Sequence, residues 1–212
     1  MLLRVTGLSR FQSQTLPILC PGCGHKGNFT PIPGAEDLMA YSPTAIVFGS
    51  RHCPNEECQT LVFVLYSPPR GPVLASYPPG RLPWDAANVP PSVAAPFIEA
   101  LTCHAHGCFV AAAMLVRKTM ELLCDDRGLD RKSNLKERIA DLRSKAILPE
   151  PLLVAADSIR LLGNDAAHIE AKTYDEVGRD EVEAAIELTQ ELLKAVYQYE
   201  HLLKRLQALR KP

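Results

Sequence analysis

The sequence predicts an α+β protein in which a small β-rich N-terminal unit precedes an all-α bundle of four or five helices. Short β-branched and aromatic runs between turn residues fill residues 1–66. Nine of the 18 prolines fall within residues 67–96, and apolar residues recur at helical spacing from about residue 92. We therefore expect a β-rich unit at 1–66, a proline-rich linker at 67–91 and a helical bundle at 92–212.

The composition is that of a folded chain without a strong charge bias. Of the 212 residues, 47% are hydrophobic and 22% are charged, and the net charge is -1. Residues 1–90 contain 6 Lys and Arg against 5 Asp and Glu, and the remainder contains 17 against 19. The basic residues of the β-rich unit, among them Arg10, Lys26 and Arg51, are too few to predict a phosphate-binding groove.

Two runs in the first segment have the composition of strands, Ala45–Phe48 and Thr60–Tyr66. Proline fixes φ and has no amide hydrogen, so the proline-rich segment that follows cannot form a long helix or a central strand. This segment is either a stiff linker or an extended strap laid over one domain. No apolar run approaches the roughly 20 residues needed to span a bilayer, so we expect no membrane partner.

Helical periodicity marks three apolar faces before a long last helix, with a break at Pro149 and Pro151. The last helix begins near Asp180, where Glu183 completes a capping-box-like pair. It carries two apolar stripes, which indicate either a helix central to its own bundle or the seam of a dimer. The longer stripe comprises Ala185, Leu188, Leu192, Ala195, Tyr199, Leu202, Leu206 and Leu209, and the shorter one comprises Val182, Ile186, Leu193, Val196 and Leu203.

Four cysteines in the first segment have the spacing of a metal site. Cys20 and Cys23 enclose Pro-Gly in a knuckle, and Cys53 and Cys58 form a looser second pair. Zinc prefers four sulfur ligands in a tetrahedron, and a segment this short needs such a cross-link to fold well. The pattern predicts a zinc ribbon with a structural zinc ion bound by these four thiolates. The neighbouring histidines, His25 and His52, are candidates to replace one cysteine.

The other three cysteines predict packing rather than a second metal site. The run from Cys103 to Cys108 also contains His104 and His106, but it straddles an expected turn between helices. We interpret its cysteines as helix-packing residues and its histidines as surface residues. Cys124 is expected in the core. Seven cysteines is an odd number, and metal-type spacing fits a cytoplasmic, reducing compartment.

A polar stripe on the third helical run holds the candidate catalytic residues. Asp157, Arg160, Asn164 and His168 follow one another at three, four and four residues, and so share one helix face. Arg, Asn and His in this order could orient a phosphate and move a proton. The alternative is that His168 caps the helix end and that Asp157 and Arg160 form a surface ion pair.

The segment from about residue 92 to 200 resembles a bacterial family catalogued as domain of unknown function 4145. The resemblance lies in three sequence segments, Ala111–Leu123, Ala156–Arg160 and Gly163–His168. The last of them reads Gly-Asn-Asp-Ala-Ala-His. Members are similar to the HEPN superfamily of helical bundles, and some relatives also have an N-terminal zinc ribbon. The resemblance implies a four- or five-helix bundle, commonly dimeric, in RNA-related, defence or restriction settings.

The resemblance also implies a catalytic pattern. Active HEPN ribonucleases use an Arg that precedes a His by four to six intervening residues, often with Asn next to the Arg, and need no metal. His168 and Asn164 match, whereas Gly163, Leu162 and Leu161 occupy the positions for the Arg, and Arg160 lies one residue too far.

Two functions follow from these observations. The first is a zinc-binding adaptor or nucleic-acid-associated protein that forms a homodimer and contacts RNA, DNA or a restriction or defence protein. The second is a metal-independent endoribonuclease that uses His168, Arg160 and Asn164. The displaced arginine removes electrostatic support for a phosphoryl transition state, which favours the first function.

Overall fold

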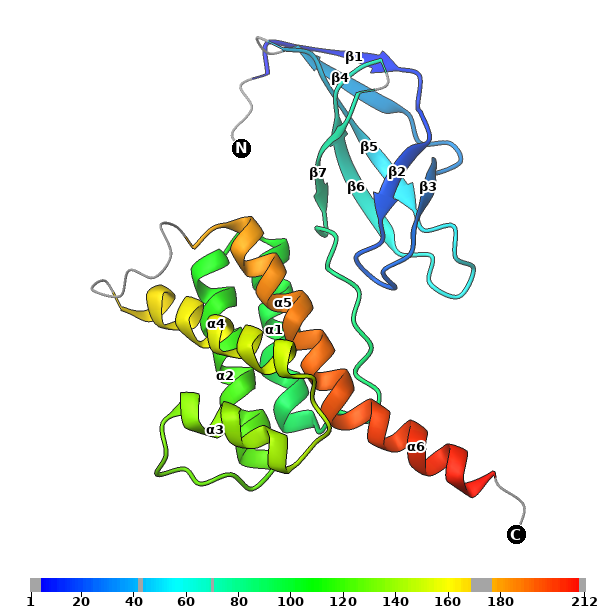
Figure 1. Ribbon diagram of the computed structural model, residues 1–212. Coiled ribbons are helices and arrows are strands. Elements are labelled where there is room, and N and C mark those ends of the chain that lie inside the picture. Colours follow the sequence, from blue (N-terminus) through cyan, green and yellow to red (C-terminus); the bar gives the residue numbers. More distant parts are fainter. Residues whose placement is uncertain (1–4, 42–43, 70, 169–176, 210–212) are drawn as a thin grey trace. The chain divides into compact units, whose positions relative to one another are not determined.

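The structure is a computed structural model that describes residues 5–41, 44–69, 71–168 and 177–209. The chain divides into two compact units, which we call the sheet unit (Met1–Pro83) and the helical unit (Trp84–Pro212). Strands fill the first and helices fill the second (Figure 1). The predicted α+β class is therefore confirmed.

The described part of the sheet unit is an antiparallel sheet of seven strands. Strand β5 is its centre: β3 and β4 pair with successive stretches of it and β6 pairs along almost its whole length. Strands β1, β2 and β7 extend the sheet from β4, β3 and β6 respectively. The strands are β1 (Gly7–Phe11), β2 (Leu16–Leu19), β3 (Lys26–Pro31), β4 (Asp37–Tyr41), β5 (Ile46–His52), β6 (Leu61–Tyr66) and β7 (Val73–Tyr77).

The core of the sheet unit follows from the two-residue period of its strands. On β6, Val62 and Val64 are buried while their neighbours Leu61 and Phe63 are exposed. Val47 of β5 and the β2–β3 hairpin complete the core on the same side. The resulting cluster is small, because it draws mainly on β2, β3, β5 and β6.

A buried ion pair joins three strands of the sheet. Arg51 is fully buried, and its Nη1 and Nη2 atoms donate to the Asp37 carboxylate at 2.9 and 2.6 Å. The Arg51 Nε atom donates to the Gln14 carbonyl at 2.9 Å, and the Tyr66 hydroxyl donates to Asp37 at 2.7 Å. Burial alone would raise the pKa of Asp37, but the hydrogen bonds from Arg51 and Tyr66 lower it below its ordinary value.

Strand β7 lies inside the proline-rich segment that the sequence assigns to a linker. Val73–Tyr77 pairs with β6, and prolines flank this strand without interrupting it. An edge strand tolerates such neighbours because only one of its sides has to pair. The first half of the segment is thus part of the sheet, and the division between units falls between Pro83 and Trp84.

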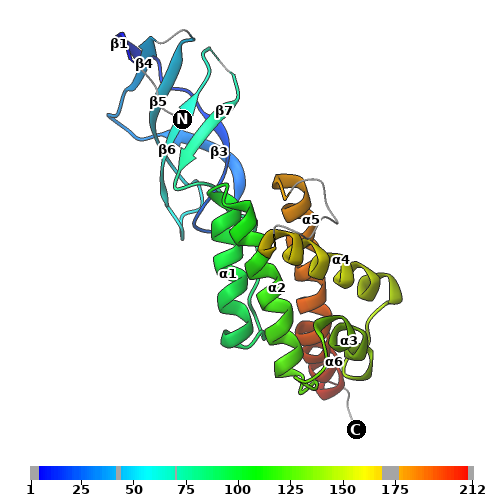
Figure 2. The ribbon, with the colours of Figure 1, turned by 90° about the vertical axis from the view of Figure 1, so that its left-hand side faces the viewer.

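The helical unit is a bundle whose helices bury the faces that the sequence predicts. Helices α1 and α2 lie side by side (Figures 1 and 2), joined by a turn in which Gly107 has φ +76°. Ala112, Val116 and Met120 of α2 and Ile159 of α4 are buried. The helices are α1 (Pro91–Ala105), α2 (Phe109–Asp126), α3 (Leu135–Asp141), α4 (Glu150–Ala167), α5 (Arg179–Leu193) and α6 (Tyr199–Ala208).

The last long helix differs from its prediction in two respects. It begins at Arg179, and Glu181 rather than Glu183 accepts the N-terminal amide of Gly178, at 3.1 Å. A π-helical turn, η2 (Lys194–Gln198), then separates α5 from α6. The part upstream of this turn is central to its own bundle, whereas every residue of α6 is exposed.

We expect Asp37→Ala to destabilise the sheet unit by about 3–5 kcal/mol, because it leaves the Arg51 charge buried without a counter-ion. Tyr66→Phe removes one hydrogen bond to the pair and should cost about 1 kcal/mol. Urea unfolding followed by hydrogen exchange of β4–β6 measures both.

The Asp37 pKa is lowered on folding, so its stabilisation is present above about pH 4 and is lost on acidification below it. The difference between wild type and Asp37→Ala should therefore shrink at low pH, and a constant difference would contradict this account.

Candidate functional site

The four predicted cysteines converge at one end of the sheet core. Cys20 and Cys23 lie in the turn after β2, and Cys53 and Cys58 lie in the loop between β5 and β6. Their Sγ atoms all lie within 4.8 Å of one another. Two sulfur pairs, Cys20–Cys58 and Cys23–Cys53, are each 3.7 Å apart. A tetrahedron with metal–sulfur bonds of about 2.3 Å has sulfur–sulfur edges of about 3.8 Å, so this cluster fits a metal ion.

The backbone around the cysteines forms two turns that hold the sulfurs in place. The Gly24 amide donates to the Cys20 carbonyl at 3.0 Å, and Gly24 has the left-handed φ of +71° that closes this turn. The Gly22 amide points at the Cys20 sulfur at 3.4 Å. A Cβ on Gly22 would lie 2.2 Å from Thr60 Oγ1 and 3.2 Å from the Cys58 sulfur. The Pro-Gly knuckle therefore requires glycine for its close approach to the second pair.

The Cys53 and Cys58 thiols lie in different environments, which shift their pKa values in opposite directions. Burial raises the pKa of the Cys53 thiol to about 12. Hydrogen bonds from the Thr60 side chain and backbone lower the pKa of the Cys58 thiol to about 6, and the Thr60 hydroxyl lies 3.0 Å from the Cys58 sulfur. A cation bound between them would favour the thiolate form of both. Neither His25 nor His52 joins the cluster among the described residues.

The residues around the α1–α2 turn do not form a second cluster of this kind in the described part of the chain. His104 is buried, which corrects its prediction as a surface residue, and it contacts the Phe109 ring with a centroid distance of 5.8 Å. Its Nε2 atom lies 3.7 Å from Glu183, and burial lowers its pKa. Cys124 is fully buried on α2, as predicted, and burial raises its pKa to about 11.

The polar stripe of α4 separates into an ion pair and a helix end. Arg160 Nε donates to Asp157 Oδ1 at 2.6 Å, and this hydrogen bond lowers the Asp157 pKa. Helix α4 ends at Ala167, so His168 is its exposed C-terminal cap, with its amide donating to the Asn164 carbonyl at 2.9 Å. This geometry is that of the alternative interpretation, a capping histidine beside a helical ion pair.

The structure adds an arginine that the sequence analysis did not select. Arg117 of α2 donates from Nη1 to the Asn164 side-chain oxygen at 2.7 Å and to the Arg160 carbonyl at 3.2 Å. Its Nε atom lies 3.3 Å from Glu121. Helices α2 and α4 approach so closely here that a Cβ on Gly163 would lie 2.5 Å from the Arg117 Cβ. Gly163 is a glycine inside a helical pattern, and this is the feature of the sequence that could have indicated the close crossing of the two helices.

The fold and the sites together define a protein with a sheet unit whose four clustered cysteines could hold a metal ion, and with a separate helical unit. A family model described as "Domain of unknown function (DUF4145)" matches residues 98–211, more than half of the chain. The chain therefore belongs to this family. Searches of curated proteins and of solved structures each found no match. The zinc ribbon and the HEPN-like character of the bundle stay predictions.

Among the described residues, no helix combines the length and the apolar character that crossing a bilayer requires.

We expect the folded chain to bind one divalent metal ion per molecule at the four sulfurs. Co²⁺ added to the metal-free protein should produce the sulfur-to-metal absorption of a tetrahedral thiolate site. Cys53→Ser should abolish that spectrum, whereas Cys108→Ser should keep it because Cys108 is exposed and outside the cluster. Chelation should expose the sheet unit to proteolysis. An unchanged spectrum in Cys53→Ser would place the metal elsewhere.

Proposed function

We propose that this protein is a zinc-stabilised adaptor whose sheet unit binds a protein partner through an uncharged apolar face. Sulfur-only, tetrahedral coordination favours zinc over harder cations, and four protein ligands leave no position for a catalytic water. The zinc then has a structural role, holding the β2–β3 and β5–β6 turns together. The metal-type spacing of the four clustered cysteines supports a reducing, cytoplasmic setting.

One observation carries this proposal: the sheet face opposite the core is mostly apolar and has no Lys, Arg, Asp or Glu along β5–β7. Leu61, Phe63 and Tyr77 are 57%, 41% and 70% exposed. The Phe48 and Phe63 rings lie 6.0 Å apart, and Phe63 is paired with Tyr77 across the strands. Exposed aromatic and aliphatic surface of this kind marks interaction sites. The face comprises Phe48, Ser50, His52, Leu61, Phe63, Leu65, Ala75 and Tyr77.

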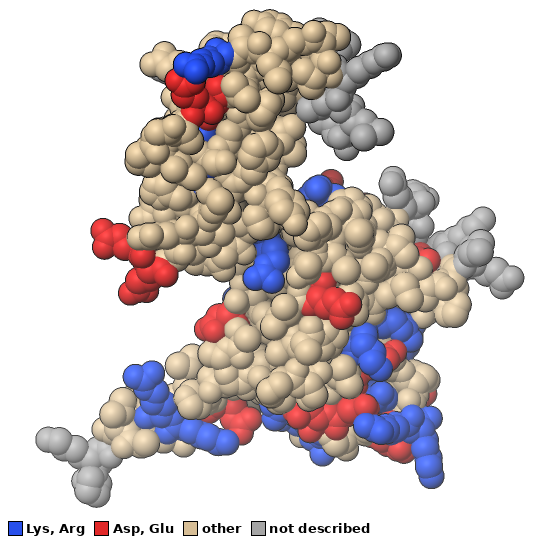
Figure 3. Space-filling model, turned by 180° about the vertical axis from the view of Figure 1, so that it is seen from behind, with Lys and Arg blue, Asp and Glu red and all other residues tan. Residues whose placement is uncertain are grey.

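The charges of the sheet unit favour a protein partner over nucleic acid. Arg51, one of its few cations, is buried against Asp37, and Arg10 is paired with Glu36 at 3.0 Å. Most of the surface of this unit that is visible in Figure 3 is neither basic nor acidic. Phosphate binding depends on several exposed cations, which this face does not offer. The defence or restriction setting rests on the family resemblance alone.

We expect peptides selected from a random display library on the zinc-loaded chain to be apolar and weakly charged. Phe63→Glu should weaken their binding at least about tenfold, because it places a charge in the centre of the apolar face. Tyr41→Glu is the matched control, since Tyr41 is 44% exposed on β4 and lies on the side of the sheet that Met39 shares with the core, away from the proposed face. Fluorescence anisotropy with mixed-sequence RNA and DNA runs in parallel. Tight oligonucleotide binding that weakens as salt rises would overturn the protein-adaptor proposal in favour of a nucleic-acid partner.

The position of Arg117 favours a second candidate function, the metal-independent endoribonuclease. Arg117 reaches Asn164 from the neighbouring helix. It thus places a guanidinium beside the Gly163–His168 segment, which lacks the arginine that the HEPN pattern expects. In such a reaction Arg117 or Arg160 would bind the phosphate, Asn164 would orient it, and His168 would take the proton from the RNA 2′-hydroxyl. Both guanidiniums are already paired with carboxylates, Glu121 and Asp157, so each would have to exchange a partner for the phosphate.

The adaptor proposal predicts that neither wild type nor His168→Ala cleaves mixed-sequence RNA. The ribonuclease predicts chelator-resistant cleavage to 2′,3′-cyclic-phosphate ends by wild type, lost in His168→Ala and in Arg117→Ala. Lys132→Ala serves as a control for substitution elsewhere on the bundle surface, because Lys132 is exposed and lies outside the Arg117–Asn164 contact. His168 is an exposed cap, so its replacement should leave the melting temperature nearly unchanged. Cleavage that His168→Ala retains would point to a contaminating nuclease.

A further inference from the structure

Helix α6 carries an apolar stripe that its own bundle does not cover. Tyr199, Leu202, Leu203, Leu206 and Leu209 are between 50% and 74% exposed. They recur at the three- and four-residue spacing of a single helix face. The opposite face is polar, with Lys204 Nζ bonded to Glu200 at 2.7 Å. A helix with this division of surface is built to bury one side.

The bundle's described contacts with this helix are concentrated just before α6. Arg127, at the end of α2, donates to the Val196 carbonyl at 3.0 Å and lies over the Tyr197 ring at 4.2 Å. The Tyr197 hydroxyl donates to Asp126 at 2.8 Å. A π-helical turn leaves carbonyls without regular partners, and Arg127 satisfies one of them. Beyond this anchor α6 projects from the bundle (Figure 1).

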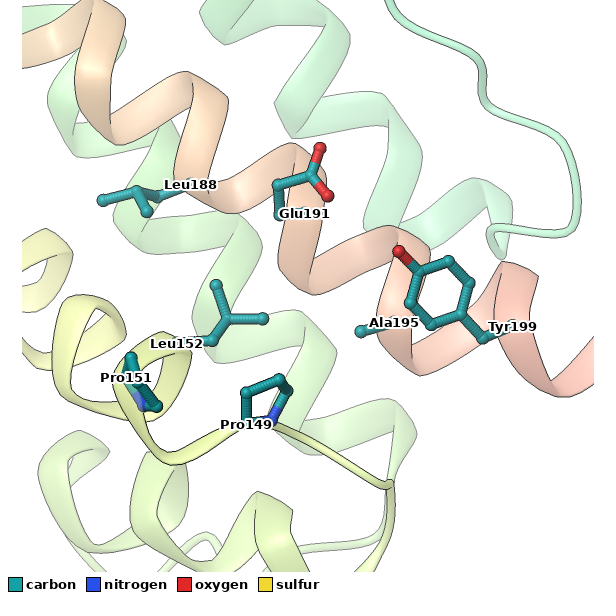
Figure 4. Close-up of a pocket in the computed structure, with 7 residues that line it drawn as sticks. All are labelled: Pro149, Pro151, Leu152, Leu188, Glu191, Ala195 and Tyr199. Carbon is teal, nitrogen blue, oxygen red and sulfur yellow. The ribbon is translucent and has the colours of Figure 1, made fainter.

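An apolar groove on the same unit leads directly into the stripe. It has a volume of about 380 Å³ and lies between the start of α4 and the α5–α6 helix (Figure 4). Leu188, Ala195 and Tyr199 line the helix side of the groove, and Pro149 and Leu152 line the α4 side. Tyr199 belongs to both groove and stripe, so the two form one continuous apolar track.

We infer that α6 of each chain binds in this groove of a second copy, in an antiparallel dimer with a two-fold axis beside Tyr199. Leu209 lies ten residues after Tyr199 and Leu188 lies eleven before it, so an antiparallel partner brings the two to the same level. The groove and the helix that fills it are parts of the same chain, as an isologous interface requires. This inference does not depend on the proposed adaptor function.

The charges beside the track are also complementary in this arrangement. Glu191 borders the groove on α5, where Lys194 of the same chain pairs with it at 2.7 Å, and Lys204 and Arg205 flank the stripe on α6. The two-fold axis brings Arg205 of one copy to within about two residues, or roughly 3 Å along the helix, of the level of Glu191 in the other. Parallel pairing would instead place the basic α6 helices beside each other. The charge pattern therefore selects the antiparallel arrangement.

The exposed surface is sufficient for a dimer of moderate affinity. Five large side chains, each more than half exposed or close to it, offer on the order of 500 Å² of apolar surface per copy. With the groove that receives them, the total approaches the roughly 1,000 Å² or more that specific interfaces bury. We therefore expect a dimer that dissociates on dilution.

Sedimentation of the full zinc-loaded chain over a concentration series tests the interface. Wild type should approach twice the mass of one chain, and the double variant Leu202→Glu with Leu206→Glu should stay monomeric. Val110→Glu is the matched control, since Val110 is a 51% exposed helical residue outside the track. Circular dichroism should be unchanged in all three, because Leu202 and Leu206 make no buried contact within one chain. A monomeric wild type, or a dimeric double variant, would overturn the inference.

A charge exchange tests the antiparallel register. Arg205→Glu and Glu191→Arg should each weaken the dimer at least about tenfold, because each variant alone places like charges at both copies of the contact. An equimolar mixture of the two variants should recover dimerisation, since both contacts then pair opposite charges. Failure of the mixture to recover would exclude this register.

Anionic phospholipid vesicles are a further probe: a monomeric wild type that sediments with them through Leu202 and Leu206 would assign the stripe to a membrane surface and overturn the dimer.

Discussion

The sheet unit is organised around a guanidinium that has no access to water. Arg51 lies on the central strand, and its five donors need acceptors that only Asp37 and nearby carbonyls provide. Its partners come from β4, the β1–β2 connection and its own strand, so the ion pair requires the consecutive strands β4 and β5 to pair in this register. A slip by one residue would turn Arg51 to the opposite face and leave Asp37 buried alone.

The small size of the apolar core explains why the unit combines this pair with a sulfur cluster. Cys20 and Cys53 belong to the same buried cluster as Val62 and Val64, so the cysteine cluster and the apolar core form one packed unit. The sulfurs lie in the turns at one end of β5, and Arg51, the penultimate residue of that strand, joins it to β4 through Asp37. Both the ion pair and the cysteine cluster act on contacts between strands on the core side, and neither uses the outer face of β6, where Leu61 and Phe63 are exposed.

The sequence was most informative where the chemistry is local. The spacing of two cysteine pairs, one a knuckle and one looser, predicted the cysteine cluster, and helical periodicity located α2 and α4. The burial of charged side chains was harder to predict. From the sequence Arg51 is expected to be a surface cation, and only its pairing with Asp37 across strands reveals that it is buried. Arg117 was overlooked because its partner, Asn164, lies 47 positions away. Strand β7 was hidden by flanking prolines, and neither η2 nor the exact start of α5 has a side-chain signature that periodicity can detect.

The π-helical turn at Lys194–Gln198 has a consequence for how the long helix can change in evolution. One extra residue per turn rotates everything downstream by about 100° relative to a regular α-helix. The upstream half is phased to its bundle, and the downstream half has a phase of its own. Substitutions that tune the surface of α6 are thereby decoupled from the packing of α5. A single-residue deletion in this turn would rephase α6 without altering one side chain upstream, so that interaction specificity could diverge among relatives while the bundle stays constant.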